Sequence, residues 1–203
     1  MIRTIQDEIR DFEADLGLPK SFYLNLLHED DWSFVVKLNA MFEGACTHTL
    51  TVRLHAPELS GAFAQLDFAN TKFGKVALLC SLNAITKEQA AVLQSLAQLR
   101  NSLVHNVAKI SFSFTSYVAA LDSNQLKKLI KEFGYGINDT IEIANKCVPK
   151  AQVVRENPKL SLWVTAAEIL ACLYLERKVA VLHLQELALA ELQKLTAPLP
   201  ATD

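Results

Sequence analysis

The sequence predicts an all-α protein, a helical bundle that ends in a long C-terminal helix. Of the 203 residues, 51% are hydrophobic and 21% are charged, which supplies enough apolar side chain for a packed core. Six glycines and six prolines are few for this length, and leucine and alanine, which favour helices, are abundant. The stretch from Lys159 to Leu195 contains neither glycine nor proline. A chain of this length forms one domain, or one domain with an appended segment.

Residues 1–30 predict two helices that pack on the bundle. Within residues 4–16, apolar side chains recur at the spacing of one helix face. Gly17 followed by Pro19 is typical of the end of a helix, because neither residue continues it easily. A second, shorter helix is expected over residues 21–28.

Residues 31–110 predict the core of the bundle. Asp30 or Asp31 is a suitable N-cap for a long helix with an apolar stripe. That helix is expected to end near His55, since Pro57 disfavours the helical conformation in the residue before it. Three further helices are expected over residues 57–70, over residues 72–83 and from Thr86 to His105.

Residues 111–203 predict a helical extension of the same domain. Ile110 to Phe114 alternates apolar residues with serine, which is typical of a short strand or an extended connector. Helices are expected over residues 122–131, 138–147 and 159–195, with a polar linker over residues 151–158. The first half of the last helix is apolar nearly all round and should be buried. A helix this long often crosses a partner subunit, so a homodimer is expected.

The residues most indicative of function are Arg100, Asn101 and His105, near the end of the predicted helix that begins at Thr86. They combine a cation suited to phosphate with the side chain type that exchanges protons near neutral pH. At about 100° per residue, Arg100 falls inside the apolar arc of this helix, while Asn101 and His105 share a neighbouring face. A guanidinium there needs a partner, which could be an acidic residue such as Glu43 or Asp67, or a bound phosphate.

The pattern Arg-Asn-x-x-x-His resembles the motif of the HEPN superfamily, a set of all-α domains common in microbial defence and toxin–antitoxin systems. The segment Phe73 to Thr86, leading into Leu96 to His105, is similar to the mannitol operon repressor-like branch of that superfamily. The resemblance covers residues 32–106. It implies a HEPN-like helical bundle.

In catalytic members, the resemblance implies a metal-independent endoribonuclease that acts as a dimer on RNA. Arg100 would then hold the scissile phosphate, and His105 would act as general base or acid. Asn101 would orient the histidine or the phosphate. The chain departs from many active members at Val107, where they carry a tyrosine.

Two other functions remain open. Members that resemble the mannitol repressor act as non-catalytic transcriptional regulators or protein-interaction modules, and a nucleotide-binding domain without cleavage is a third possibility. Without the resemblance, Arg100 reads as one half of a buried ion pair and His105 as a helix-end cap. Glu43 and Lys75 are supporting candidates, either beside Arg100 and a phosphate or as plain salt bridges.

Charge and composition limit the partners. The net charge of −2 gives no general basic field, so RNA contact must rest on a local site or on a groove formed between subunits. RNA, a second copy of the chain and an antitoxin or regulatory protein are the expected partners. His48 and His55 share one helix face, but no third ligand accompanies them, so neither a metal nor another cofactor is expected.

The chain is expected to be cytoplasmic. Its amino terminus is amphipathic and acidic, unlike a signal peptide. The apolar run from Leu160 to Leu175 contains Glu168 and is shorter than the roughly 20 residues that a membrane span needs. The four cysteines form no Cys-x-x-Cys pair, so they are expected to be free thiols rather than zinc ligands.

Overall fold

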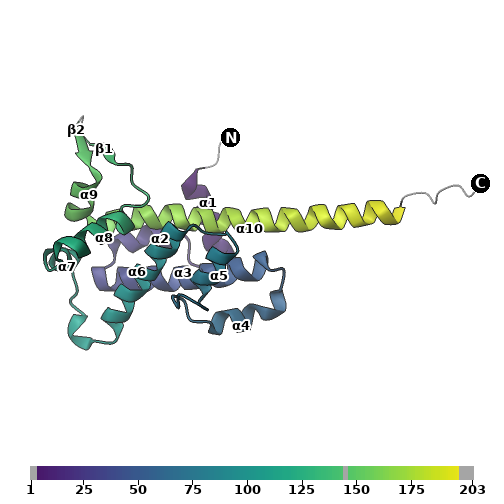
Figure 1. Cartoon of the computed structure of the whole chain (residues 1–203), viewed down its shortest axis with the longest axis horizontal. Helices are drawn as coiled ribbons and strands as arrows, with labels where there is room; N and C mark the ends of the chain where they lie inside the picture. The colour runs from purple at the N-terminus through teal and green to yellow at the C-terminus, as the bar shows by residue number, and fades with distance from the viewer. Residues whose placement is uncertain (1–3, 144–145, 197–203) are drawn as a thin grey trace, which may run out of the picture.

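The computed structural model describes residues 4–143 and 146–196, and it confirms an all-α bundle with a long C-terminal helix (Figure 1). The helices are α1 Ile5–Asp15, α2 Phe22–Asn25, α3 Asp31–Arg53, α4 Ser60–Gln65, α5 Lys75–Ser81, α6 Lys87–Val104, α7 Phe114–Ala119, α8 Ser123–Phe133, α9 Lys150–Glu156 and α10 Pro158–Thr196. Short 3-10 turns cover Leu26–His28, Pro57–Leu59 and Val107–Lys109. The parts of the predictions that concern residues 1–3, 144–145 and 197–203 lie outside the described residues.

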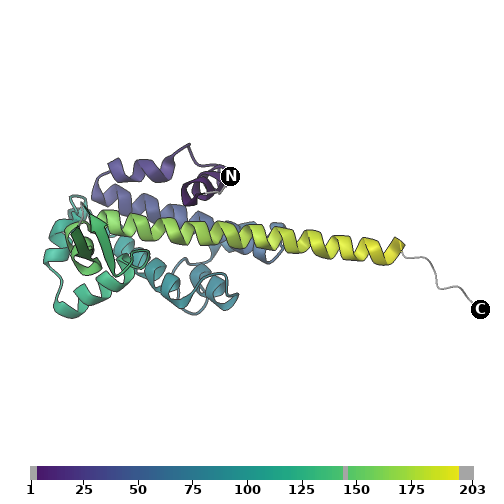
Figure 2. The ribbon, with the colours of Figure 1, turned by 90° about the horizontal axis from the view of Figure 1, so that it is seen from above.

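Helix α10 is the axis of the bundle, and it packs chiefly along α3 and α1. In Figure 2 it runs between the purple N-terminal helices on one side and the teal helices on the other. Leu170 of α10 and Leu38 of α3 are fully buried in the same core cluster, together with Leu96 of α6. Burying apolar side chains of this size is the main driving force for the fold.

Side-chain caps begin the main helices where the sequence predicts. Thr4, Thr86 and Asp122 each form a capping box, in which the cap and the third helical residue satisfy one another's backbone N–H groups. Asp30 accepts a hydrogen bond of 2.9 Å from the backbone N–H of Ser33 and so caps α3. The Ser33 hydroxyl donates to the other carboxylate oxygen at 2.6 Å, and together with the backbone N–H of Ser33 it holds the pKa of Asp30 below its ordinary value. Each cap stabilises its helix by roughly 1 kcal/mol.

The predicted helix over residues 138–147 is wrong, because this segment forms a β-hairpin. Strand β1, Thr140–Ile143, pairs antiparallel with β2, Lys146–Pro149, and Thr140 lies opposite Pro149. Strand β1 reads Thr-Ile-Glu-Ile, and such β-branched residues in polar–apolar alternation favour a strand. The aspartate at position 139 resembles a helix cap, but it pairs with Lys150 at 2.8 Å instead.

The prediction for the segment that follows the hairpin also needs correction. Residues 151–158, expected as a linker, lie mostly in helix α9, whose Val153 and Val154 are buried. In residues 151–156, burial of these two valines decides the conformation against a weak local pattern. For Ile110 to Phe114 the sequence left a strand or a connector open, and the structure has the connector: the segment is irregular up to Ser113, which caps α7.

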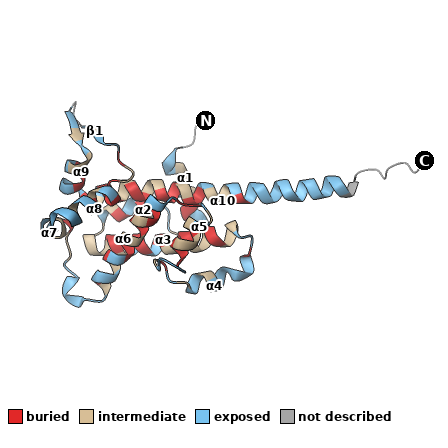
Figure 3. Cartoon of the chain, viewed as in Figure 1, coloured by how far each residue is buried: buried red, intermediate tan, exposed pale blue. Residues whose placement is uncertain are grey.

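The two halves of α10 differ in burial (Figure 3). Its first half lies in the core, as predicted, whereas every side chain from residue 181 to residue 194 is exposed. We call residues 181–194 the α10 arm. By length and composition alone, Pro158–Lys194 could cross a membrane, yet 56% of its most apolar window is buried against the rest of the protein. A buried core helix meets the same criterion, so the expected absence of a membrane partner stays a prediction.

Candidate functional site

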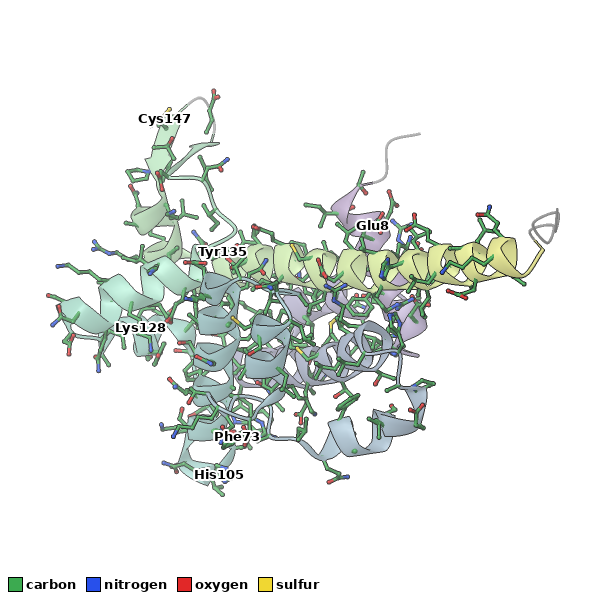
Figure 4. The ribbon with its side chains drawn as sticks, turned by 45° about the vertical axis from the view of Figure 1, so that its right-hand side comes forward. Glu8, Phe73, His105, Lys128, Tyr135 and Cys147 are labelled. Atoms are coloured by element: carbon green, nitrogen blue, oxygen red, sulfur yellow. The ribbon has the colours of Figure 1, made fainter. Side chains whose placement is uncertain are left out.

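The predicted motif lies at the end of α6. Thr86 caps the start of this helix, and His105 is the residue that follows its last turn, with its backbone N–H bonded to the Asn101 carbonyl at 3.3 Å. The His105 side chain is exposed, and Figure 4 shows it at the end of the molecule opposite the hairpin that carries Cys147. It therefore has open access to a large ligand or to a second subunit.

Arg100 does not form the ion pair that the sequence allows. Its Nη1 donates a hydrogen bond of 3.0 Å to Oδ1 of the neighbouring Asn101. No carboxylate of the described residues forms a salt bridge with it, although Glu43 and Asp67 line the same cleft. A half-buried guanidinium without a carboxylate partner retains most of its capacity to bind an anion.

Arg100 and Asn101 line a cleft of about 340 Å³ between α3 and α6, closed on one side by the segment that follows α4. We call it the α3–α6 cleft. Its other lining residues are Asn39 and Glu43 of α3, Ala97 of α6, and residues 64–69. His105 is not among them. Within one chain, the structure thus brings Arg100 and Asn101 together and leaves His105 apart.

Glu43 and Lys75 form a salt bridge with each other. Lys75 Nζ lies 3.2 Å from Glu43 Oε1 and donates a second hydrogen bond to the Ala64 carbonyl at 3.1 Å. The Lys75 side chain is only 1% exposed, whereas that of Glu43 is 42% exposed. Lys75 therefore ties α5 to α3 and is too buried to meet a phosphate, while the partly exposed Glu43 side chain lines the cleft.

The segment before α5 is a hydrogen-bonded wall of the cleft. Asp67 Oδ1 accepts from the backbone N–H groups of Ala69 at 2.9 Å and Asn70 at 2.5 Å. A Cβ atom on Gly74 would lie 2.5 Å from the Asn70 carbonyl oxygen, so only glycine fits there. This wall is consequently fixed in shape.

Asn39 is a site residue that the sequence analysis missed. It is 4% exposed, and its Oδ1 is buried without a hydrogen-bond partner among the described residues. The available signal was an amide within the apolar stripe of α3, one turn before Glu43. Buried polar atoms without partners are rare in folded proteins, so this one marks the cleft lining as unusual.

A second hollow, of about 530 Å³, lies between α1, α2 and α10. Tyr23 and Trp163 stack in its wall with ring centroids 5.0 Å apart, and the Trp163 indole donates to the Tyr23 carbonyl at 3.0 Å. Burial raises the pKa of the Tyr23 hydroxyl well above its ordinary value. The pKa of the Glu168 carboxyl, beside Gly136, is also raised by burial. No sequence motif pointed to this hollow.

Metal-ligating side chains do not gather in the part of the chain that the structure describes, where no three of histidine, cysteine, aspartate or glutamate could hold an ion. His48 is half-buried, and burial together with the nearby Arg177 lowers its pKa. Burial raises the pKa of the Cys46 thiol to about 12. Cys46 is therefore an inert core thiol.

Comparisons with protein-family models, with curated proteins and with solved structures gave no match to this chain. The similarity to the HEPN superfamily thus rests on the motif and on the residues that precede it. The roles of these motif residues depend on the chemistry of the site.

Proposed function

We propose that this protein is a metal-independent endoribonuclease of the HEPN kind, which acts on RNA as a cytoplasmic homodimer. The observation that supports this most is the state of Arg100. It is rooted in the apolar face of α6, where a charge is costly, and yet no described carboxylate pairs with it. A phosphate of the RNA backbone supplies the missing partner.

The reaction is an internal transesterification. The ribose 2′-oxygen forms a bond to phosphorus while the bond from phosphorus to the 5′-oxygen breaks, which leaves a 2′,3′-cyclic phosphate and a 5′-hydroxyl. An imidazole takes the proton of the 2′-hydroxyl, and a protonated imidazole delivers one to the leaving oxygen. Arg100 stabilises the charge that builds on the phosphoryl oxygens, with Asn101 holding the guanidinium in place.

A dimer explains the separation of His105 from the α3–α6 cleft. In one chain the histidine lies beyond the last turn of α6 and faces solvent. A two-fold axis beside this end of α6 would place each histidine near the arginine of the other subunit. Two imidazoles would then be available, one as base and one as acid.

The alternative is a non-catalytic regulator or protein-interaction module of the mannitol repressor-like kind. It is favoured by the α10 arm, which carries exposed leucines such as Leu182 and Leu189, each 58% exposed. Exposed apolar surface of this kind marks protein interaction sites. An antitoxin or regulatory protein that covers the arm is compatible with either function.

The test is incubation of the purified protein with total RNA in the presence of EDTA, beside His105→Ala and the control His28→Ala. His28 is an exposed histidine outside the motif. We expect cleavage with 2′,3′-cyclic phosphate ends by wild type and by the control, and a loss of at least 100-fold in His105→Ala. Intact RNA with folded wild-type protein, or equal cleavage by His105→Ala, would favour the interaction module.

A further inference from the structure

The α3–α6 cleft contains more polar groups than phosphate binding by Arg100 requires. Asn39, one of its lining residues, is 4% exposed and has a buried amide oxygen without a partner among the described residues. Leaving such a group unpaired costs about 1–3 kcal/mol of folding free energy, whereas an apolar side chain of the same shape would avoid that cost. This amide indicates a ligand that completes its hydrogen bonding.

The lining of the cleft includes two carboxylates, Glu43 and Asp67, which act only as hydrogen-bond acceptors when ionised. Glu43 pairs with Lys75 through one carboxylate oxygen, and its side chain remains 42% exposed at the cleft. Asp67 is exposed on the opposite wall, with one oxygen bonded to two backbone N–H groups. A ligand that fits these walls must bring N–H or O–H donors. The exocyclic amino group of a nucleobase offers two donors on one nitrogen.

Arg100 and Asn101 line the same cleft and provide the complementary anion site. A nucleotide carries both required features, a phosphate and a base edge. The cleft volume of about 340 Å³ is in the range of small-ligand sites.

We propose that the α3–α6 cleft binds a nucleobase with an exocyclic amino group, which Asn39 reads while Arg100 and Asn101 hold the phosphate of the same nucleotide. This inference rests on the proposed action on RNA and adds a preference for adenine, cytosine or guanine over uracil at that position. Unstacked bases of single-stranded RNA are read through such edge contacts.

Ligands that differ in one functional group test this directly on the full-length protein. Adenosine 5′-monophosphate and inosine 5′-monophosphate differ at the amino group, and cytidine and uridine 5′-monophosphate form a second pair. In titrations followed by amide chemical shifts, the nucleotide with the amino group should bind about tenfold more tightly than the other nucleotide of its pair. The nucleotide without the amino group leaves buried acceptors of the cleft unpaired. Ribose 5-phosphate should bind more weakly than either adenosine or cytidine monophosphate.

Three variants test which residues of the cleft bind the base and which bind the phosphate. Asn39→Leu should remove the preference for amino-bearing bases, keep binding of ribose 5-phosphate, and unfold at a higher temperature than wild type. Thr49→Val is the matched control, because Thr49 is a buried polar residue of the same helix that lies outside the cleft and bonds to the Ala45 carbonyl. Arg100→Ala should weaken all phosphorylated ligands by a similar factor.

The outcomes separate this inference from the proposed function. Equal binding of the adenosine and inosine nucleotides, absence of nucleotide binding, or an unchanged preference in Asn39→Leu would overturn the base site. If RNA cleavage is nonetheless lost in His105→Ala, the nuclease proposal stands without it. If the amino preference is found but RNA stays intact, the base site stands and the protein binds nucleotides without cleaving RNA.

Discussion

The two halves of α10 have similar composition and opposite surroundings. In the first half, Leu162, Ile169 and Leu170 are fully buried. In the α10 arm, Leu182, Leu187 and Leu189 are each more than half exposed. Both halves are continuous helix with no break between them. Leucine content and helix formation therefore do not decide whether a side chain is buried, whereas the presence of neighbouring helices does.

A set of ionic contacts lies at the point where α10 extends beyond α1 and α3. Arg177 pairs with Asp15 of α1, and its guanidinium lies 5.4 Å from the ring centroid of Tyr174. The Tyr174 hydroxyl donates to Asp11 at 3.0 Å. On the other side, Arg53 of α3 lies 3.9 Å from Glu176. Beyond this level α10 continues past the ends of α1 and α3, and the side chains of residues 181–194 are exposed (Figure 1).

The arm exposes apolar side chains around its circumference rather than along one stripe. Leu182 and Leu189 are two turns apart on one face, while Leu184 and Leu187 point elsewhere on the helix. Exposed apolar surface of this extent marks an interaction site, and the partner that we propose for it is a second copy of the chain.

Truncation of a leucine should separate the two halves most clearly. We expect Leu170→Ala to lower the free energy of unfolding by about 3 kcal/mol, because it opens a cavity in a fully buried site. Leu182→Ala should change it by less than about 0.5 kcal/mol in dilute protein. Urea unfolding followed by circular dichroism measures both. Similar losses for the two variants would contradict the contrast.

Charges placed on the arm should weaken self-association without unfolding the body. We expect wild type to sediment as a dimer at micromolar concentration. The double change Leu182→Asp and Leu189→Asp should raise the dimer dissociation constant at least about thirtyfold, or about 2 kcal/mol. Sedimentation velocity over a concentration series gives the result. A monomeric wild type would contradict the proposed dimer, and a variant dimer of equal affinity would place the interface away from the arm.

Removal of the contact at the exit of α10 should have an intermediate effect. Arg177→Ala leaves Asp15 without its ion pair and removes the cation above the ring of Tyr174. We expect a loss of about 1–2 kcal/mol in unfolding free energy. Lys194→Ala, which breaks an exposed pair with Glu191 on the arm, is the control and should cost almost nothing. Equal effects would show that the two pairs are energetically alike.

The pH dependence of stability gives the smallest effect. The pKa of Glu168 in the buried half is raised by burial, so the folded chain keeps this proton to a higher pH than the unfolded chain. Stability therefore falls as the pH rises from the ordinary value of about 4.5 through the raised pKa. Glu168→Gln should make the decrease in unfolding free energy over this pH range smaller by about a few tenths of a kcal/mol. Melting temperatures measured from about pH 4 to about pH 7, the range in which a carboxyl group with a raised pKa titrates, test this difference between the variant and wild type. A profile as steep as that of wild type would contradict the assignment.

Periodicity and caps in the sequence were sufficient to locate the main helices. Thr4, Asp30, Thr86 and Asp122 are caps that act within one turn, so their effect can be read locally. The helical wheel also places Arg100 and His105 on different faces of α6, and the structure keeps them apart. The hairpin of β1 and β2 was missed because its two strands depend on each other, and neither pattern is strong alone.

The sequence alone was enough to establish that this chain is helical and that α10 is one long helix, whereas its assignment of Arg100 and His105 to phosphate chemistry stays a prediction. The tertiary structure was needed to show that Arg100 has no described acidic partner, that Lys75 is buried against Glu43, and that Asn39 lines the cleft with an unpaired amide oxygen. Helix formation and capping are local interactions between residues close in the chain. Pairing and burial depend on which distant helices meet, which periodicity does not specify.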